Sequence, residues 1–182
     1  MFKDLWINGV KVYEPKIFED ERGLFFESYN KNLFFNNGIT CEFVQDNNSK
    51  SLKKYTIRGL HFQIGKYAQA KLVRCTKGSI LDFVVDLRKD SKTFLSWEKV
   101  ELSENNKKMI FVPRGFAHGF ITLEDDVEVS YKVDNFYNKE NERTLIYNDK
   151  TINIDWGINL TKENVILSEK DLLGKSIEEL DF

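Results

Sequence analysis

The two histidines of this 182-residue chain both lie in dense apolar segments, His61 in "RGLHFQ" and His118 in "FAHGF". An imidazole titrates near neutral pH, so a histidine held away from bulk water can act as a general base. Strand alternation predicts that His61 is the one ionisable group on its face, next to Gly59, which leaves room for another molecule. Spacing alone also fits a satisfied core residue at His61 and a loop residue at His118.

A lysine and a tyrosine are also predicted to point inward. In "QAKLVRC" Lys71 shares a strand face with Val73 and Cys75, and in "SYKVDNFY" Tyr131 shares one with Val133. Such groups are costly to bury unless a ligand or a partner satisfies them. With a histidine base they suit proton transfer at a carbon next to a carbonyl, where a cation stabilises the enolate oxygen and the phenol acts on the opposite face. Two simpler interpretations stay open, a lysine that snorkels to the rim and a core tyrosine with a solvated hydroxyl.

The histidine count argues against a metal site. Small β-barrels that hold a metal commonly use two histidines one residue apart, together with a third histidine and a carboxylate. This chain has no His-x-His, and its two histidines are 57 positions apart. We therefore expect no bound metal, which disfavours a metal-dependent oxygenase.

The elements that must position these residues read as β-strands. Short aromatic and β-branched runs recur between Gly, Asn, Asp and Lys, and roughly a dozen strands at this spacing predict an all-β sandwich or jelly-roll barrel. "TKGS", residues 76–79, predicts a tight hairpin turn that uses Gly78. Two short helices are expected, one in residues 29–38 that ends at Gly38, and one in residues 168–180 that Ser168 caps.

Composition narrows the class of protein. The length suits one domain, residues 1–182, and no linker-like stretch divides the chain. The net charge of −2 argues against a nucleic-acid binder. No apolar run has the length of a membrane helix, and the N-terminus lacks the apolar core of a signal peptide. Cys41 and Cys75 fit reduced, buried thiols, so we expect a cytoplasmic protein.

The motifs, taken together and in order, resemble one known family. They are "PKIFEDERGLFFESYN", "FVQDNNSKS", "IRGLHFQ", "AQAKLVRC", "DFVVDLRKDSKTF", "ELSENNKKMIFVPRGFAHGF", "YKVDNFYNKENE", "IYNDKTINIDW" and "LSEKD", which run from about residue 14 to 171. This order is similar to that of the dTDP-4-dehydrorhamnose 3,5-epimerases. The resemblance implies a cupin-like jelly roll, no cofactor, and a homodimer in which strands within about residues 1–30 join the partner's sheet. It also implies an isomerase of deoxysugar biosynthesis, which supplies lipopolysaccharide or capsule.

The resemblance assigns roles around the reacting sugar. His61 is implied as the base that removes the protons from C3 and C5 of a 4-keto sugar, and Tyr131 as the acid on the opposite face. Asp171 is implied as the partner of His61, although "SEKD" also fits a capping box in which Asp171 serves only the helix start. Lys71 and His118 are implied to stabilise the enolate. A further residue, Asp82, is expected to support the lysine or the second histidine.

The resemblance also implies a nucleotide-binding half of the site. Tyr137 matches the position that stacks on thymine, and the remaining matched positions contact the nucleoside, the diphosphate or the sugar: Arg22, Glu27, Gln45, Asn47, Arg58, Glu142 and Lys170. The resemblance implies that Arg22 and Glu27 serve the partner's site in the family's dimers. Strand alternation predicts that Arg58 points away from His61, and a bulge near Gly59 is the alternative that reconciles the two.

Three positions depart from the family pattern. Arg114 replaces the usual acid before "GFAHGF", Phe136 replaces a frequent tyrosine, and "DWGINL" lacks the proline that commonly follows Trp156. None is a proposed proton-transfer residue. The alternatives are therefore an epimerase for another nucleotide sugar such as a GDP-linked heptose, an enzyme that acts at C3 or C5 alone, and a barrel that binds a sugar nucleotide without catalysis.

Overall fold

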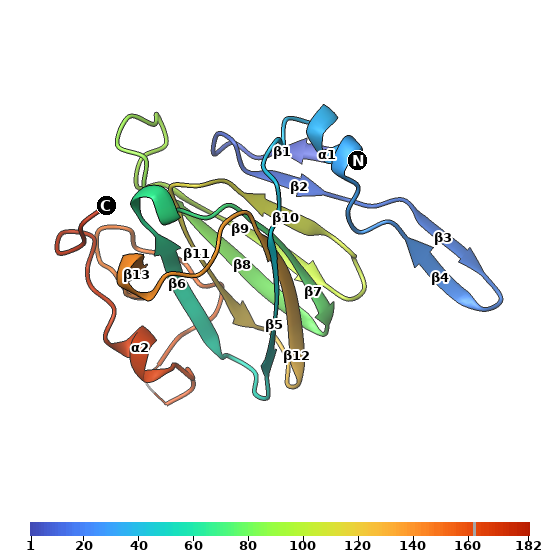
Figure 1. Ribbon diagram of the computed structural model, residues 1–182. Helices are drawn as coiled ribbons and strands as arrows, with labels where there is room; N and C mark the ends of the chain where they lie inside the picture. Colours follow the sequence, from blue (N-terminus) through green and yellow to red (C-terminus); the bar gives the residue numbers. More distant parts are fainter. Residues whose placement is uncertain (162) are drawn as a thin grey trace.

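Two antiparallel β-sheets, packed face to face, make up the body of the protein (Figure 1). The computed structural model describes residues 1–161 and 163–182. The six-stranded sheet has the order β1 (Phe2–Asp4), β2 (Lys11–Tyr13), β10 (Met109–Val112), β7 (Lys71–Lys77), β12 (Val127–Val133) and β5 (Gln45–Ser51). The five-stranded sheet has the order β13 (Glu142–Thr144), β6 (Ile57–Gln63), β11 (Phe116–Thr122), β8 (Ser79–Asp86) and β9 (Trp97–Ser103). The expected all-β, cupin-like jelly roll is confirmed.

The main core fills the space between the two sheets. Val73 and Val129 from the six-stranded sheet meet Val84 and Phe120 from the five-stranded sheet, and all four are at most 4% exposed. Burying a side chain of this size stabilises the fold by about 1.5–3 kcal/mol relative to leaving it in water. The inward positions of β7 are thus the ones that alternation predicts, and Lys71 lies at the end of the same row.

A second core covers the outer face of the five-stranded sheet. The chain after β13 crosses this face (Figure 1). Its Trp156 is buried in one cluster with Leu60 and Phe83 of the sheet. The rings of Phe83 and Trp156 lie 4.5 Å apart. This covering segment carries α2 (Glu169–Leu172) to the side of β6, where it becomes part of the site.

The predicted hairpin at Gly78 is wrong. β7 pairs with β10 and β12, whereas β8 pairs with β9 and β11, so the turn carries the chain from one sheet to the other. The turn still requires glycine, because Gly78 has φ +75° and a Cβ there would lie 2.9 Å from Cγ2 of Val127. Local turn signals cannot distinguish a hairpin from a sheet-to-sheet connection, since both need the same backbone angle.

The two predicted helices exist, but one is much shorter than expected. α1 (Lys31–Asn36) is capped by Asn30 and is followed by Gly38 at φ +83°. α2 begins after Ser168 as predicted, yet it ends at Leu172 rather than near residue 180. Two 3₁₀ turns, η1 (Gly65–Tyr67) and η2 (Lys139–Asn141), complete the helical content of the described residues. None of the helices in residues 1–161 and 163–182 has the length and apolar character that crossing a bilayer requires.

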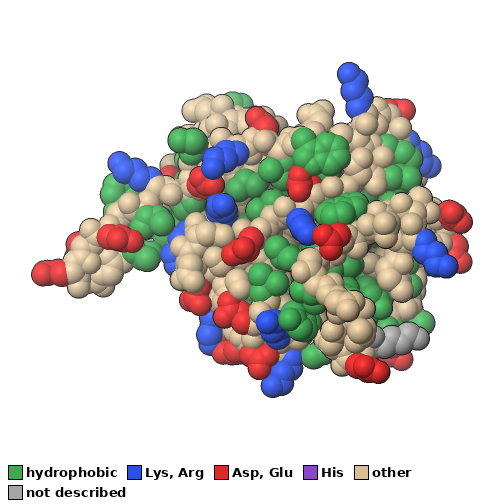
Figure 2. Space-filling view, turned by 180° about the vertical axis from the view of Figure 1, so that it is seen from behind, with side chains coloured by type: hydrophobic (Ala, Val, Ile, Leu, Met, Phe, Trp, Pro, Cys, Tyr) green, Lys and Arg blue, Asp and Glu red, His purple; other side chains and the backbone are tan. Residues whose placement is uncertain are grey.

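A hairpin near the N-terminus projects from the body. It consists of β3 (Ile17–Asp20) and β4 (Gly23–Phe26), which among the described strands pair only with each other (Figure 1). Its apolar side chains are exposed, Phe18 to 51% and Phe25 to 69% (Figure 2). β1 and β2 belong to this chain's own six-stranded sheet. Of the strands within residues 1–30, those left for pairing with a second copy are therefore β3 and β4.

Candidate active site

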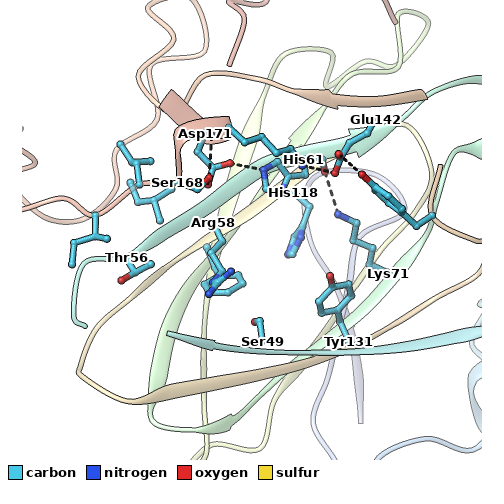
Figure 3. Close-up of a pocket in the computed structure, with 16 residues that line it drawn as sticks. Ser49, Thr56, Arg58, His61, Lys71, His118, Tyr131, Glu142, Ser168 and Asp171 are labelled. Carbon is cyan, nitrogen blue, oxygen red and sulfur yellow. Dashed lines mark hydrogen bonds and ion pairs between the residues drawn. The ribbon is translucent and has the colours of Figure 1, made fainter. Parts of the chain in front are cut away.

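A cavity of about 580 Å³ opens between the two sheets and the covering segment (Figure 3). Its walls come from both sheets and from α2. They include nine of the residues that the sequence predicts. These are His61, Lys71, His118, Tyr131, Glu142 and Asp171, together with Arg58, Tyr137 and Lys170.

A bulge in β6 places Arg58 and His61 on the same side of the sheet. His118 of β11 pairs with His61, and Phe120 pairs with Arg58, so two steps along β11 match three along β6. Gly59 takes φ +136°, and a Cβ there would lie 2.5 Å from the Cα of Gly119. The bulge near Gly59, which the sequence analysis gave as the alternative, is therefore present. Strand alternation, which predicts that Arg58 points away from His61, fails at the extra residue.

His61 and Asp171 form a hydrogen-bonded pair. His61 Nε2 lies 2.5 Å from Asp171 Oδ1, and the Asp171 side chain is only 3% exposed (Figure 3). Because the carboxylate accepts a hydrogen bond from Nε2–H, Nδ1 is the nitrogen left to act as a base. Burial lowers the pKa of His61 below 6.5 and outweighs the opposing effect of Asp171. The imidazole is therefore neutral, and able to accept a proton, at neutral pH.

Asp171 pairs with His61 and also lies at the capped start of α2, so it does not serve the helix start alone. Ser168 is the N-cap of α2, since its Oγ accepts the backbone N–H of Asp171 at 3.2 Å. The same hydroxyl donates to Asp171 Oδ2 at 2.7 Å, while Oδ1 serves His61. Burial opposes ionisation of the carboxyl group, but these two hydrogen bonds and the nearby charges hold the pKa of Asp171 below 3.8.

Lys71 brings a buried cation to the base. Its side chain comes from β7 in the opposite sheet, and the residue is 9% exposed. Nζ donates to the backbone oxygen of His61 at 3.1 Å. Burial lowers the pKa of Lys71 from 10.5 to about 8, although the charges of Asp82 and Glu142 favour the protonated form. The ammonium group is charged at neutral pH and can stabilise an oxyanion.

Asp82 lies behind the cavity wall and holds His118. Nε2 of His118 lies 3.0 and 2.9 Å from the two oxygens of Asp82, which is fully buried. Of the two residues that Asp82 was expected to support, His118 is the one to which it is hydrogen-bonded. Its effect on Lys71 is electrostatic, since its charge raises the pKa of the lysine. With Nε2 occupied, His118 presents Nδ1 to the cavity.

Tyr131 faces these groups from the six-stranded sheet (Figure 3). Burial is the main cause that raises its pKa above 10, so the phenol is protonated at neutral pH and can donate. A neutral base on one wall and a neutral acid on the other suit proton removal and return on opposite faces of one carbon. Lys71 and His118 lie beside them, which suits stabilisation of the negative oxygen that forms in between.

The predicted nucleotide-binding residues divide into two groups. Gln45 and Asn47 line an adjoining cavity of about 140 Å³, which shares its Tyr137 and Glu142 wall with the main cavity. The exposed Tyr137 donates its hydroxyl to Glu142 Oε2 at 3.1 Å, and Glu142 Oε1 pairs with Lys170 at 2.5 Å. An aromatic ring at the mouth of a charged cleft suits a nucleobase followed by a phosphate.

Arg22 and Glu27 lie apart from both cavities. Arg22 is at the tip of the β3–β4 hairpin, where its guanidinium pairs with Asp20, and Glu27 is exposed just after β4. Within one chain they do not complete the site.

Several lining residues escaped the sequence analysis. They are Ser49, Thr56, Ile57, Phe120, Ile166 and Leu167, together with Ser168 in its contact with Asp171. Ile166 reaches the cavity through a parallel bridge to Thr56. Pairing between residues so far apart leaves no local signal in the sequence. For Ser168, the capping pattern was the available signal.

Comparisons with known proteins identify the family of this chain. A family model described as dTDP-4-dehydrorhamnose 3,5-epimerase matches residues 4–179. A protein of that name from Shigella flexneri is 48% identical over 177 residues, which are 97% of this chain and 95% of the relative. The crystal structure of such an epimerase from Elizabethkingia anophelis is 44% identical with a TM-score of 0.93, covering 100% of this chain and 98% of the other.

A third comparison comes with a bound sugar nucleotide. The structure of an epimerase from Legionella pneumophila in complex with dTDP-4-keto-L-rhamnose is 40% identical, has a TM-score of 0.93, and covers 100% of this chain and 94% of the other. The matches extend over nearly the whole chain, including every strand that lines the cavity. This chain belongs to the dTDP-4-dehydrorhamnose 3,5-epimerase family, whose members are isomerases.

Proposed function

We propose that this protein inverts C3 and C5 of a dTDP-linked 4-keto-6-deoxyhexose, a step of dTDP-L-rhamnose-type deoxysugar biosynthesis, without a cofactor. One observation carries the proposal. A neutral, carboxylate-bound imidazole at His61 faces a protonated phenol at Tyr131 across a cavity that also holds the Lys71 ammonium. A barrel that only binds a sugar nucleotide has no use for this combination.

In the proposed mechanism the C4 carbonyl acidifies the neighbouring carbon. His61 Nδ1 takes the proton from C3, and the electron pair of the C–H bond becomes the enolate, with negative charge on the C4 oxygen. Lys71 donates a hydrogen bond to that oxygen, and His118, held in place by its hydrogen bond to Asp82, contributes to its stabilisation. The enolate then takes the Tyr131 proton on its other face, and solvent restores both residues. The same steps follow at C5.

The nucleotide half supports a dTDP carrier. Tyr137 offers a ring for thymine, Arg58 and Lys170 offer positive charge for the diphosphate, and Gln45 and Asn47 offer amides for the sugar. The sugar nucleotide bound in the Legionella relative is of this class.

A homodimer is part of the proposal. The β3–β4 hairpin exposes Phe18 and Phe25 and pairs with no other strand in residues 1–161 and 163–182. An apolar, unpartnered strand edge is the kind of surface that a second copy covers by adding its own strands. In such a dimer Arg22 and Glu27 reach the partner's nucleotide site. The chain then works as a single domain, residues 1–182, and its two unpaired cysteines support a cytoplasmic location.

Hydrogen exchange at the sugar carbons tests the function. The protein is incubated in deuterated water with dTDP-4-keto-6-deoxyglucose, and in parallel with a GDP-linked 4-keto sugar, while NMR follows C3 and C5. We expect exchange at both carbons of the dTDP sugar only. Exchange at one carbon would identify a mono-epimerase. Exchange with the GDP-linked sugar would assign a different substrate. No exchange with either sugar would indicate a protein that binds a sugar nucleotide without catalysis.

A further inference from the structure

Ser168 makes two hydrogen bonds to the residue that orients the base. Its Oγ accepts the backbone N–H of Asp171 at 3.2 Å and donates its own proton to Asp171 Oδ2 at 2.7 Å (Figure 3). The other carboxylate oxygen, Oδ1, accepts from His61. The carboxylate is thus held from both ends, by the imidazole on one side and by the hydroxyl on the other.

The hydroxyl is itself held in place by β6. Ile166, two residues before Ser168, exchanges backbone hydrogen bonds with the residues beside Thr56, from Ile57 N to Ile166 O at 2.9 Å and from Ile166 N to Tyr55 O at 3.0 Å. His61 is on the same strand, so this bridge fixes the distance between the serine and the base. α2 has only four residues and cannot hold the Asp171 side chain by its own stability.

We propose that Ser168 is a positioning residue of the reaction, which fixes the plane of the Asp171 carboxylate and takes up part of its charge. Through this contact it keeps His61 in the tautomer that presents Nδ1 to the substrate, as a base that is neutral at working pH. The inference rests on the proposed function, and it adds a third member to the predicted dyad.

The charges around the pair set the sign of the expected effect. The charge of Asp171 favours protonation of His61, whereas the charges of Lys170 on α2 and Lys71 on β7 disfavour it. Glu142 on β13 forms an ion pair with Lys170. The hydrogen bond from Ser168 lowers the pKa of Asp171. Without it the carboxylate becomes a stronger acceptor for an imidazolium, so the pKa of His61 rises.

The test uses three variants of one position. Ser168→Thr keeps the hydroxyl. Ser168→Gly removes the hydroxyl, and the start of the helix is little affected because glycine is itself among the preferred N-cap residues. In this variant Asp171 Oδ2 is open to water. A water molecule can donate a hydrogen bond to this oxygen but does not fix the orientation of the carboxylate. Ser168→Ala is a second variant without the hydroxyl, and each protein is compared with the wild type.

The first readout does not depend on substrate. The chain has only two histidines, so an NMR titration of the imidazoles yields two curves, and His61→Asn assigns them. We expect Ser168→Gly and Ser168→Ala to raise the pKa of His61 by about 0.5 unit and to leave the His118 curve unchanged. An unchanged His118 curve also reports an intact barrel. Ser168→Thr is expected to titrate like the wild type.

The second readout is kinetic. We expect Ser168→Gly to lower kcat about ten-fold, as the loss of a partner behind a functional histidine commonly does, with KM nearly unchanged and the acidic limb of the pH profile moved to higher pH. An unchanged His61 curve in Ser168→Gly, or an equal change in Ser168→Thr, would overturn the inference. Failure of the proposed function is distinguishable, because it appears as absent exchange in the wild type whatever the titrations give.

Discussion

The backbone oxygen of His61 accepts a hydrogen bond from Lys71 Nζ at 3.1 Å, which joins the five-stranded sheet to the six-stranded sheet at the base itself. The lysine therefore has two functions. It fixes the strand that carries the imidazole, and it brings a positive charge to the place where the proposed mechanism puts the substrate carbonyl. Burying that charge costs stability, as the lowered pKa of about 8 indicates.

Lys71→Met is expected to lose activity and gain stability. Methionine keeps the length of the side chain but removes the cation, so kcat should fall by about 10²–10³-fold, the size of effect seen when one oxyanion donor is removed. The folded pKa of Lys71 is lowered, so its burial penalty is full below pH 8 and vanishes as the pH rises toward 10.5. Urea denaturation should show that the free energy of unfolding of the variant exceeds that of the wild type by about 2–3 kcal/mol at pH 7. This difference should be smaller at pH 10. A variant that loses stability at pH 7 would contradict this account.

Tyr131→Phe separates proton removal from inversion. The ring remains, but no acid stands on the second face of the enolate, so His61 must return the deuteron to the face from which it came. In deuterated water we expect exchange into the substrate with at least a ten-fold loss of inverted product. NMR of the sugar distinguishes the two outcomes. Normal inversion by this variant would assign the acid to another group.

Asp86 is expected to stabilise the fold away from the site. Its buried carboxylate accepts hydrogen bonds from Arg88, Ser91 and Thr93. Burial opposes ionisation, but these donors lower the pKa of Asp86 to about 2. The contribution is therefore present above pH 4 and is lost as the pH falls toward 2. Asp86→Asn should cost about 2 kcal/mol at pH 7 by urea denaturation, with a difference that shrinks below pH 4. A difference that grows in acid would refute this assignment.

Phe25→Asp tests the dimer. Phe25 is 69% exposed on the unpartnered hairpin, and a charge there opposes burial against a second copy. Light scattering should give a dimer for the wild type and a monomer for the variant. Activity should fall about ten-fold or more, because Arg22 and Glu27 no longer reach the partner. Leu52→Asp, at a position 66% exposed and outside the hairpin, is the matched control and should remain a dimer. A monomeric wild type with full exchange activity would exclude the shared site.

The fold class and the inward direction of Lys71 and Tyr131 could be predicted from the sequence, because period-two alternation holds along β7 and β12. It fails along β6, where the bulge at Gly59 turns Arg58 to the side of His61. That bulge exists because Gly59 packs against Gly119 of another strand, a contact that no local pattern encodes.

The covering segment was the hardest part to predict. The capping pattern at Ser168 is correct, but the apolar residues beyond Leu172 pack as irregular chain on the five-stranded sheet rather than as helix. The contacts of Asp171 with His61, and of Ile166 with β6, join residues about one hundred positions apart. Only the resemblance to a family could suggest the first of them.

The central claim is that the neutral imidazole of His61 takes the proton from the carbon next to the ketone. Its most direct measurement is deuterium exchange at C3 and C5 of dTDP-4-keto-6-deoxyglucose with His61→Asn, which keeps a side chain able to hydrogen-bond to Asp171. The account predicts that exchange at both carbons falls by at least 10³-fold while binding of dTDP stays within a few-fold of the wild type. Exchange at either carbon at the wild-type rate would contradict it.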